Sequence, residues 1–173
     1  MKRPITAVSL LVIVCLLALT IVAQSQAADP RVGVWKLNVA KSKYSPGPPP
    51  QTSVWRFENR ADGFTVITIS GTNSRGEPTF THVVLKYDEK DYPAYGNASV
   101  TALVREGTKL GTMAHKLVDP YTMIVTPKDS KGVVGIPITV AISKDGKTLT
   151  QTVKGKNLQG QAVENVAIYD RTQ

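Results

Sequence analysis

Two histidines and one short acidic run are the residues in this sequence whose types could support acid–base or metal chemistry. His82 and His115 have no carboxylate or second histidine at a metal-ligand spacing, so a metal site would need residues from several strands. The run Asp88-Glu89-Lys90-Asp91 supplies neighbouring carboxylates. Glycoside hydrolysis, however, needs two carboxyl groups about 5 to 10 Å apart across a cleft. We therefore interpret the histidines as structural and the acidic run as a solvated loop.

Motifs typical of catalytic sites are absent from the sequence. The chain contains no Gly-x-Ser-x-Gly elbow, His-Glu-x-x-His pair, Cys-x-x-Cys pair or phosphate-binding glycine loop. Its one cysteine, Cys15, lies in an N-terminal apolar run, so no disulfide is expected. We predict a protein that is not an enzyme and that binds no metal and no cofactor.

The composition is that of a globular protein with a basic surface. Hydrophobic residues make up 42% of the chain and charged residues 20%, which excludes a disordered tail, a collagen-like fibre and a polytopic membrane protein. The formal charge of +8 makes anionic surfaces candidate partners. The lysines fall mainly in expected turns, as at Lys128 and Lys144. They do not form a basic stripe interleaved with aromatic residues, so we expect no nucleic-acid partner.

The first 27 residues have the features of a secretory signal peptide. Met1-Lys2-Arg3 is positively charged, residues 7–23 form an apolar run, and Ser25-Gln26-Ala27 places small residues at the cleavage positions. An uncleaved membrane anchor is the alternative, because about 17 to 20 apolar residues can span a bilayer. We expect cleavage after Ala27. This leaves one domain, residues 28–173, which has no stable membrane span and is located in the periplasm or outside the cell.

The rest of the chain has the pattern of short strands joined by turns. Runs rich in Val, Ile, Thr and aromatic residues alternate with Gly, Asn and Asp clusters, and no stretch keeps helical periodicity. Successive hairpins predict a meander, and closure into a barrel removes its exposed edges. The sequence therefore predicts an all-β fold, a single up-and-down antiparallel β-barrel of about 8–10 strands. The expected strands are 33–38, 52–59, 64–71, 79–87, 99–105, 112–118, 121–126, 133–143, 148–155 and 162–170, with Pro137 at a bulge or unpaired position.

Two segments of the chain share the same order of turn signals. Asp62-Gly63 and the run 71–76 recur as Asp145-Gly146 and the run 155–160, and both runs have the form Gly-x-Asn-x-x-Gly. The similarity indicates either an internal repeat or two independent uses of favourable turn residues. In both cases we expect each segment to be a three-stranded meander.

Several segments together resemble the exported bacterial lipocalin-like proteins. They are Gly33-Val34-Trp35-Lys36-Leu37-Asn38, Lys41-Ser42-Lys43-Tyr44-Ser45-Pro46, Lys86-Tyr87-Asp88, the run 143–150, and Ala167-Ile168-Tyr169-Asp170. The resemblance implies that Gly33 and Trp35 are structural residues, with the indole seated at the closed end of the barrel. It also implies that an arginine near the end of the last strand packs on this indole, and Arg171 is the candidate.

Strand alternation predicts which side chains face the barrel interior. The expected apolar interior includes Trp35, Trp55, Phe57, Leu85, Val153, Val166 and Ile168. The polar residues Arg105, Gln151 and Glu164 share the parity of apolar neighbours and would point inward, where a ligand or water could pair with them. Tyr87, Tyr92 and Tyr95 either line a barrel mouth or pack within their own loop.

These expectations lead to one functional hypothesis and one alternative. The hypothesis is an exported barrel that binds a small hydrophobic or amphipathic molecule, with Trp55, Phe57, Tyr87, Tyr92, Arg105 and Gln151 as ligand-binding residues. The alternative is a structural or interaction protein of the cell envelope, with a filled core and a basic surface that contacts an anionic polymer or another protein. The size of the interior cavity distinguishes the two.

Overall fold

The computed structural model describes residues 29–97, 109–157 and 159–173, and these residues form one closed antiparallel barrel of ten strands. Each strand pairs with its neighbours in the sequence, and pairing of the first strand with the last closes the barrel. The prediction of an all-β, up-and-down barrel is confirmed. The strands are β1 (Gly33–Leu37), β2 (Thr52–Asn59), β3 (Thr65–Thr72), β4 (Pro78–Leu85), β5 (Asp91–Asn97), β6 (Lys109–Asp119), β7 (Thr122–Asp129), β8 (Ile138–Ile142), β9 (Thr148–Lys156) and β10 (Ala162–Arg171), with a short 3-10 helix, η1 (Val39–Lys41), after β1.

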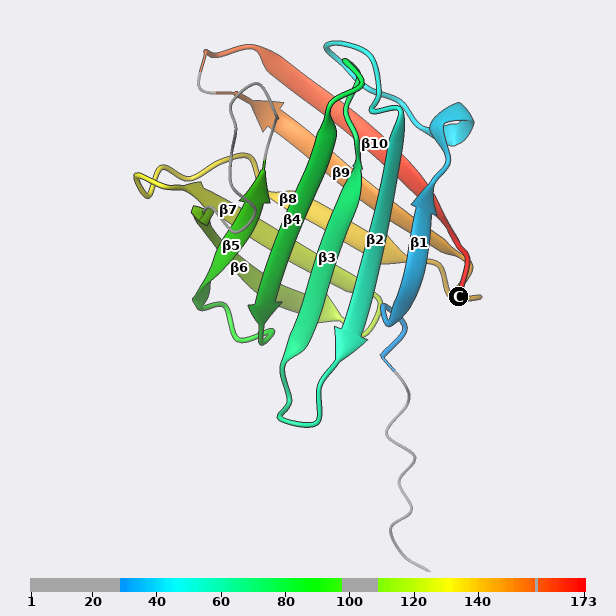
Figure 1. Cartoon of the computed structure of the whole chain (residues 1–173), viewed down its shortest axis with the longest axis vertical. Helices are drawn as coiled ribbons and strands as arrows, with labels where there is room; N and C mark the ends of the chain where they lie inside the picture. The colour runs from blue at the N-terminus through cyan, green and yellow to red at the C-terminus, as the bar shows by residue number, and fades with distance from the viewer. Residues whose placement is uncertain (1–28, 98–108, 158) are drawn as a thin grey trace, which may run out of the picture.

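The connections between strands define two ends of the barrel (Figure 1). What we call the lower end carries the β2–β3, β4–β5, β6–β7 and β8–β9 connections, together with residues 29–32 before β1. The upper end carries the β1–β2, β3–β4, β7–β8 and β9–β10 connections. The expected signal peptide lies outside the described residues, as does the expected strand 99–105 with Arg105.

The two similar segments are both three-stranded meanders, as expected. Asp62-Gly63 joins β2 to β3, and Asp145-Gly146 joins β8 to β9. In the Gly-x-Asn-x-x-Gly turns, the Asn73 Oδ1 accepts from the backbone N–H groups of residues 75 and 77, and the Asn157 Oδ1 accepts from those of residues 159 and 161. The last glycine of each turn has a positive φ, 85° at Gly76 and 78° at Gly160, which favours glycine.

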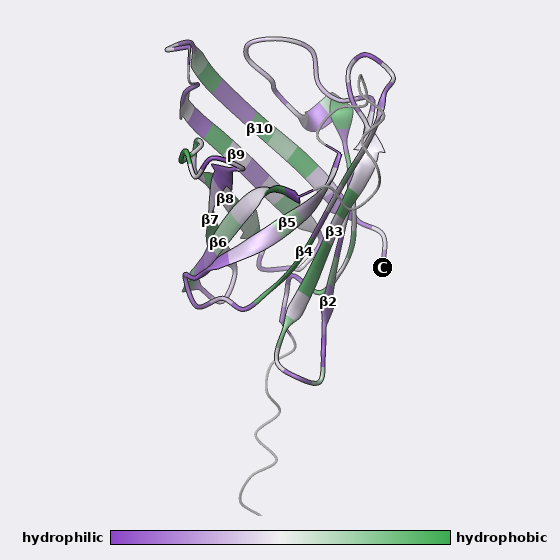
Figure 2. Cartoon of the chain, turned by 60° about the vertical axis from the view of Figure 1, so that its left-hand side comes forward, coloured by the Kyte–Doolittle hydropathy of each residue, from purple (hydrophilic) through white to green (hydrophobic). Residues whose placement is uncertain are grey.

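Side chains alternate between the barrel interior and the outside along each strand, and β9 and β10 show this as bands of hydropathy in Figure 2. In β10 the prediction of parity is wrong, because Ala167 and Tyr169 are buried at 1% and 2% exposure. Val166 and Ile168 face outward, and their backbones are hydrogen-bonded to the chain that follows β1. Both parities of β10 hold apolar residues, so periodicity alone could not choose between them.

Three other expectations about the strands differ from the structure. Glu164 faces outward and forms an exposed ion pair with Lys154, with an Nζ–Oε1 distance of 3.0 Å. Residues 91–97 form β5, where the sequence suggested a loop, and Pro93 and the glycine at 96 obscured this strand. The expected strand 133–143 begins at Ile138, directly after Pro137.

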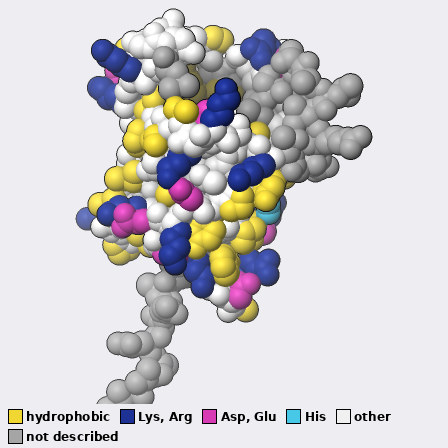
Figure 3. Space-filling model, turned by 90° about the vertical axis from the view of Figure 1, so that its left-hand side faces the viewer, with side chains coloured by type: hydrophobic (Ala, Val, Ile, Leu, Met, Phe, Trp, Pro, Cys, Tyr) yellow, Lys and Arg dark blue, Asp and Glu magenta, His cyan; other side chains and the backbone are white. Residues whose placement is uncertain are grey.

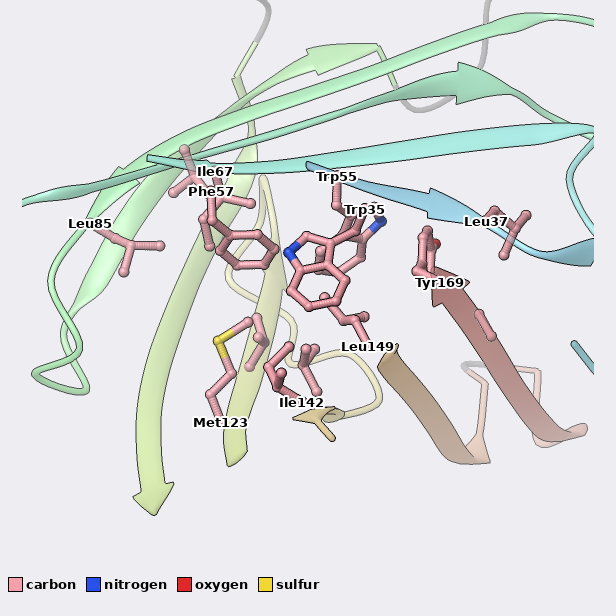
Figure 4. Close-up of a cluster of buried hydrophobic side chains, with 14 of the residues drawn as sticks. Trp35, Leu37, Trp55, Phe57, Ile67, Leu85, Met123, Ile142, Leu149 and Tyr169 are labelled. Carbon is pink, nitrogen blue, oxygen red and sulfur yellow. The ribbon is translucent and has the colours of Figure 1, made fainter. Parts of the chain in front are cut away.

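The core fills the lower and middle parts of the barrel (Figure 4). Figure 4 shows the Trp35 and Trp55 indoles between Phe57 and Tyr169, with Met123, Ile142 and Leu149 on the facing wall. Burial of these large side chains supplies the main stabilisation of the barrel, at about 25 cal/mol per Å² of apolar surface removed from water. The core residues with the least exposure are Trp35, Leu85, Met123, Val140 and Leu149, each at 0%.

Candidate ligand-binding site

Exposure of the inward-facing side chains changes from one end of the barrel to the other. In β3, Ile67 is 2% exposed, whereas Ile69, two residues nearer the upper end, is partly exposed. In β8, Val140 is 0% exposed and Ile138 is partly exposed. The same change occurs along β2, β4, β9 and β10. The interior is therefore packed near the lower end and accessible to solvent near the upper end.

The accessible part of the interior has an apolar wall. Ile69, Ile138 and Tyr44 are partly buried and pack against the core. Several other inward positions near the upper end hold small side chains, among them Ser53 in β2 and Thr81 in β4. Small residues on the inside of a barrel leave space that larger residues would fill.

Two phenols stand at the boundary between the packed and the accessible parts. The Tyr169 hydroxyl donates to the Ser53 Oγ at 3.2 Å, and its ring centroid is 5.6 Å from that of Trp55. Burial, together with the nearby Tyr169, holds the pKa of Tyr44 well above its usual range. Burial also raises the pKa of Tyr169. Both groups are therefore neutral hydroxyls that can donate to or accept from a ligand.

Gln151 supplies a polar group on the same inside face. It is partly buried and pairs in register with Val140 on one side and Ala167 on the other, both of which are buried. Among the described residues, no group is hydrogen-bonded to its side-chain amide. An amide at this position can orient the polar end of a ligand or hold a water molecule.

The structure brings together some of the predicted ligand-binding residues and separates others. Trp55 and Phe57 are in contact, with centroids 5.8 Å apart, but they are 5% and 1% exposed and form the floor of the accessible part. Tyr87 and Tyr92 lie at the lower end. The Tyr92 hydroxyl donates to the Asp88 carboxylate there, and the Tyr87 ring packs against Arg31. These two tyrosines therefore do not line the upper interior.

Gly33, Trp35 and Arg171 form a compact structural unit at the lower end. The Arg171 guanidinium carbon lies 4.2 Å from the centroid of the Trp35 ring, and the Trp35 Nε1 donates to the Arg31 carbonyl at 2.8 Å. Gly33 has a φ of 135°, and a Cβ at this position would lie 2.4 Å from the Gln173 carbonyl oxygen. A glycine is required here because any side chain would displace the end of the chain.

The two histidines have different environments, one in the buried core and one on the outer face. The described residues contain no group of three or more His, Cys, Asp or Glu side chains that could hold a metal ion. His115 is 2% exposed, and burial lowers its pKa to about 4. The His82 Nδ1 lies 3.3 Å from the Thr68 hydroxyl on the outer face. Within the described ranges, no helix is long and apolar enough to cross a bilayer.

On the face drawn in Figure 3 the cations are scattered. Figure 3 shows Lys and Arg side chains spread over one face, several of them next to Asp or Glu side chains. Ion pairs such as Lys128–Asp91 and Lys116–Glu89 account for part of this pattern. Exposed pairs of this kind contribute about 0 to 1 kcal/mol each to stability. These charges therefore serve the solubility of the protein more than the stability of its fold.

Sequence analysis did not identify Tyr44, Ser53 and Tyr169 as site residues. Tyr44 follows the chain segment that pairs with β10 through Lys43 and Val166. That pairing lies outside the regular strands and turns Tyr44 toward the core. Tyr169 was missed because the sequence analysis placed Val166 and Ile168, and not Ala167 and Tyr169, on the inward face of β10. With the correct parity, the alternation of Asn165, Ala167 and Tyr169 would have placed its phenol inside.

Three comparisons with known proteins place the fold in context. A scan against models of protein families finds no match, and a search of curated proteins finds none. Among solved structures the chain is similar to a redesigned β-barrel, at 13% sequence identity and with a TM-score of 0.47, over 85% of this chain and 96% of that chain.

Proposed function

We propose that this chain is an exported lipocalin-like barrel that holds a small hydrophobic or amphipathic molecule in its upper half. The observation that carries the proposal is the change in exposure along the inside face. The alternation of inward and outward side chains continues to the upper end. The inward side chains that lie nearer this end than Trp55, Val140 and Ile67 are nevertheless accessible to solvent. A barrel built only for stability would continue its large apolar side chains to that end.

The chemistry of the inside face indicates the class of ligand. Ile69 and Ile138 offer apolar contact, and burial of apolar ligand surface supplies most of the affinity at about 25 cal/mol per Å². Gln151 and the neutral hydroxyls of Tyr44 and Tyr169 offer a few hydrogen bonds on the same face. This combination suits an apolar body with one small polar end.

The unit at the lower end supports the lipocalin-like assignment. In that family the tryptophan of the first strand seats its indole at the closed end, and an arginine near the end of the last strand packs on it. Trp35 in β1 and Arg171 in β10 have this arrangement, at 4.2 Å. Together with the signal-peptide pattern of residues 1–27, this favours a periplasmic or secreted binding protein.

The experiment is a titration of delipidated protein with two fluorescent probes, 1-anilinonaphthalene-8-sulfonate and 11-(dansylamino)undecanoic acid. We expect saturable binding and quenching of tryptophan emission, because Trp55 forms the floor of the site. Ile138→Trp should weaken binding by about tenfold or more, since a large ring at this inward position fills the site. Thr139→Trp, at the next and outward-facing position of β8, is the matched control and should bind as the wild type does.

Two outcomes would overturn the proposal. The first is that neither probe binds the delipidated wild-type protein. The second is that Ile138→Trp, with an unfolding transition like that of Thr139→Trp, binds the probes unchanged. Val153→Phe is a second filling variant if Ile138→Trp fails to fold. The structural alternative, a filled barrel whose basic surface contacts an anionic envelope polymer or a protein, would then be favoured.

A further inference from the structure

The β7–β8 connection, residues 130–137, exposes apolar side chains at the upper end of the barrel. It is drawn in yellow in Figure 1, where it extends outward from the two strands that it joins. Val133 is 44% exposed and Val134 is 53% exposed. Pockets lie on both sides of Val134, one toward β6 and β7 and the other toward the end of β9. The two valines therefore form an apolar ridge that the described part of the chain leaves uncovered.

Hydrogen bonds hold this ridge in a defined turn. The Asp129 Oδ1 accepts from the backbone N–H groups of Lys131 and Val133, at 2.8 and 2.9 Å. The Asp129 N–H donates to the Val133 carbonyl at 3.0 Å, and the Gly135 N–H donates to the Pro127 carbonyl at 2.8 Å. Hydrocarbon excludes backbone groups that have no hydrogen-bond partner. This turn can therefore enter the surface of a bilayer with these donors already satisfied.

The charges near the ridge indicate which kind of surface it fits. Lys131 lies in the turn itself, and Lys156 lines the pocket beside Val134. Neither lysine is in an ion pair among the described residues, and the nearby carboxylate of Asp129 is bound to the turn. The other two lysines of β7 and β9 are paired, Lys128 with Asp91 and Lys154 with Glu164. Unpaired lysines beside exposed apolar side chains complement a membrane that contains anionic lipids.

The size of the ridge favours a lipid surface over a protein partner. A stable protein interface buries about 1,200 to 2,000 Å² in total. A narrow turn with two exposed valines supplies only a small part of that area. Contact with a membrane, in contrast, needs only shallow insertion of apolar side chains together with attraction between cations and headgroups.

The β6–β7 hairpin at the lower end offers an internal comparison. Val118 in this hairpin is 55% exposed, which is close to the exposure of Val134. Its surroundings differ in charge, because Asp119 follows it directly and the nearby Lys116 is paired with Glu89 at 2.9 Å. The lower hairpin thus has the apolar component of a membrane contact and lacks the unpaired lysines.

We propose that the β7–β8 connection is a membrane-contact segment. Val133 and Val134 insert into the outer part of a bilayer, and Lys131 and Lys156 contact the headgroups of anionic lipids. The segment lies at the end of the barrel where the interior is accessible. The contact itself is independent of the molecule proposed for the upper half.

The test places one fluorescent label on each of the two exposed valines. Residues 28–173 contain no cysteine, so Val134→Cys and Val118→Cys each give the exported protein a single site for a nitrobenzoxadiazole label. The probe surface is vesicles of phosphatidylcholine and phosphatidylglycerol. The label at position 134 should become brighter and its emission should shift to the blue when vesicles are added, because it enters an apolar medium. The label at position 118 should not respond.

Unlabelled variants measure what each part of the segment contributes to binding, by sedimentation with the same vesicles. The double variant Val133→Ser/Val134→Ser should weaken binding by about tenfold, and Lys131→Gln should weaken it by about fivefold. Val118→Ser and Lys144→Gln, both at the lower end, are the matched controls and should bind as the wild type does. Because the substituted positions are exposed, all four variants should keep the unfolding transition of the wild type.

Several results would overturn this proposal. They include failure of the wild type to bind the vesicles, equal responses of the two labels, and equal affinity of the double variant and Val118→Ser. Unchanged binding to pure phosphatidylcholine would refute the contact with anionic headgroups. Complete competition by soluble glycerol phosphate would show an anion site without a membrane contact.

The variant Ile138→Trp separates this proposal from that of an interior ligand. It should bind vesicles as the wild type does, whether or not the fluorescent fatty acid binds inside the barrel. Loss of vesicle binding in Ile138→Trp, with the fold retained, would instead assign the signal to lipid taken into the interior and would overturn the surface contact.

Discussion

The lower and upper halves of the barrel share the same ten strands but differ in the size of their inward side chains. The lower half contains Trp35, Phe57 and Met123, all at 1% exposure or less. The upper half contains Ser53, Thr81 and other inward positions that are partly exposed. Alternation along the strands is the same in both halves. It therefore decides which face is inside, whereas the inward side chains are buried in the lower half and partly exposed in the upper half.

The two halves also treat polar groups differently. At the lower end the Arg171 guanidinium donates to three backbone carbonyls, and His115 is enclosed with its Nδ1 unpaired. Near the upper end the polar groups lie where solvent reaches them, as Gln151 does. Substituting or charging a polar group in the lower half should therefore lower the free energy of unfolding. The same change in the upper half should have little effect on it. The following changes test this contrast.

Trp35→Ala should have the largest effect. Removing a fully buried indole costs about 3 to 5 kcal/mol in cavity and transfer terms, and here it also deprives Arg171 of its ring partner. Urea denaturation of the purified variant measures the loss. Lys36→Ala, at the next and exposed position of β1, should change the free energy of unfolding by less than about 0.5 kcal/mol. A loss below about 1 kcal/mol for Trp35→Ala would mean that the packed core of the lower half does not supply most of the stability of the barrel.

Acidification should destabilise the lower half through His115. Burial lowers the pKa of His115 to about 4 from 6.5, so the unfolded chain binds a proton that the folded chain excludes. Stability from this group is therefore complete above pH 6.5 and falls as the pH drops toward 4, by about 3 kcal/mol at pH 4. The groups around the ring are Tyr87 and, beyond it, Arg31 with Asp29.

The measurement compares urea unfolding of the wild type and His115→Gln at pH 7 and pH 4. The carboxylates titrate in both proteins, so the difference between their pH dependences isolates the imidazole. His82→Gln, on the outer face, serves as the control and should follow the wild type. Equal pH dependence of wild type and His115→Gln would contradict the enclosure of this ring.

Gln151→Leu should have the smallest effect on stability. The amide is partly buried and has no hydrogen-bond partner among the described residues, so its replacement by an apolar side chain of similar size should change the free energy of unfolding by less than about 1 kcal/mol. The same variant should alter the affinity for the dansylated fatty acid more than its stability. Destabilisation by more than about 2 kcal/mol would indicate that Gln151 belongs to the packed half.

Much of the fold could be predicted from the sequence because local signals agreed. Asp62-Gly63, Asp145-Gly146 and the two Gly-x-Asn-x-x-Gly turns fixed the order of six strands, and the structure contains all four turns. The signals failed where both parities were apolar, as at Val166 and Ala167, and where Pro93 interrupted β5. In those places the neighbouring strand determines which side chains face inward and whether a strand forms. The local sequence carries no information about that neighbour.

The candidate site was harder to predict than the fold. Trp55, Phe57 and Gln151 were placed inside by alternation, which the structure agrees with. Tyr87 and Tyr92 lie at the lower end, around the β4–β5 connection, away from the partly exposed inward positions of the upper half. Alternation along a strand assigns a side chain to one face of the sheet and does not show at which end of the barrel the interior is accessible. Tyr44 depends on a long-range bridge between Lys43 and Val166 that no local pattern announces.

The contacts of Arg171 also determine when the barrel can be completed. Its guanidinium binds the carbonyls of Val32 and Pro30, which precede it in the chain by 139 and 141 residues. During synthesis, β1 can therefore pair with its second neighbour, β10, only after almost the whole polypeptide has been made. Contacts between such distant residues slow folding and leave strand edges open to other chains in the meantime. The last strand to emerge is thus the one that ends this vulnerable period.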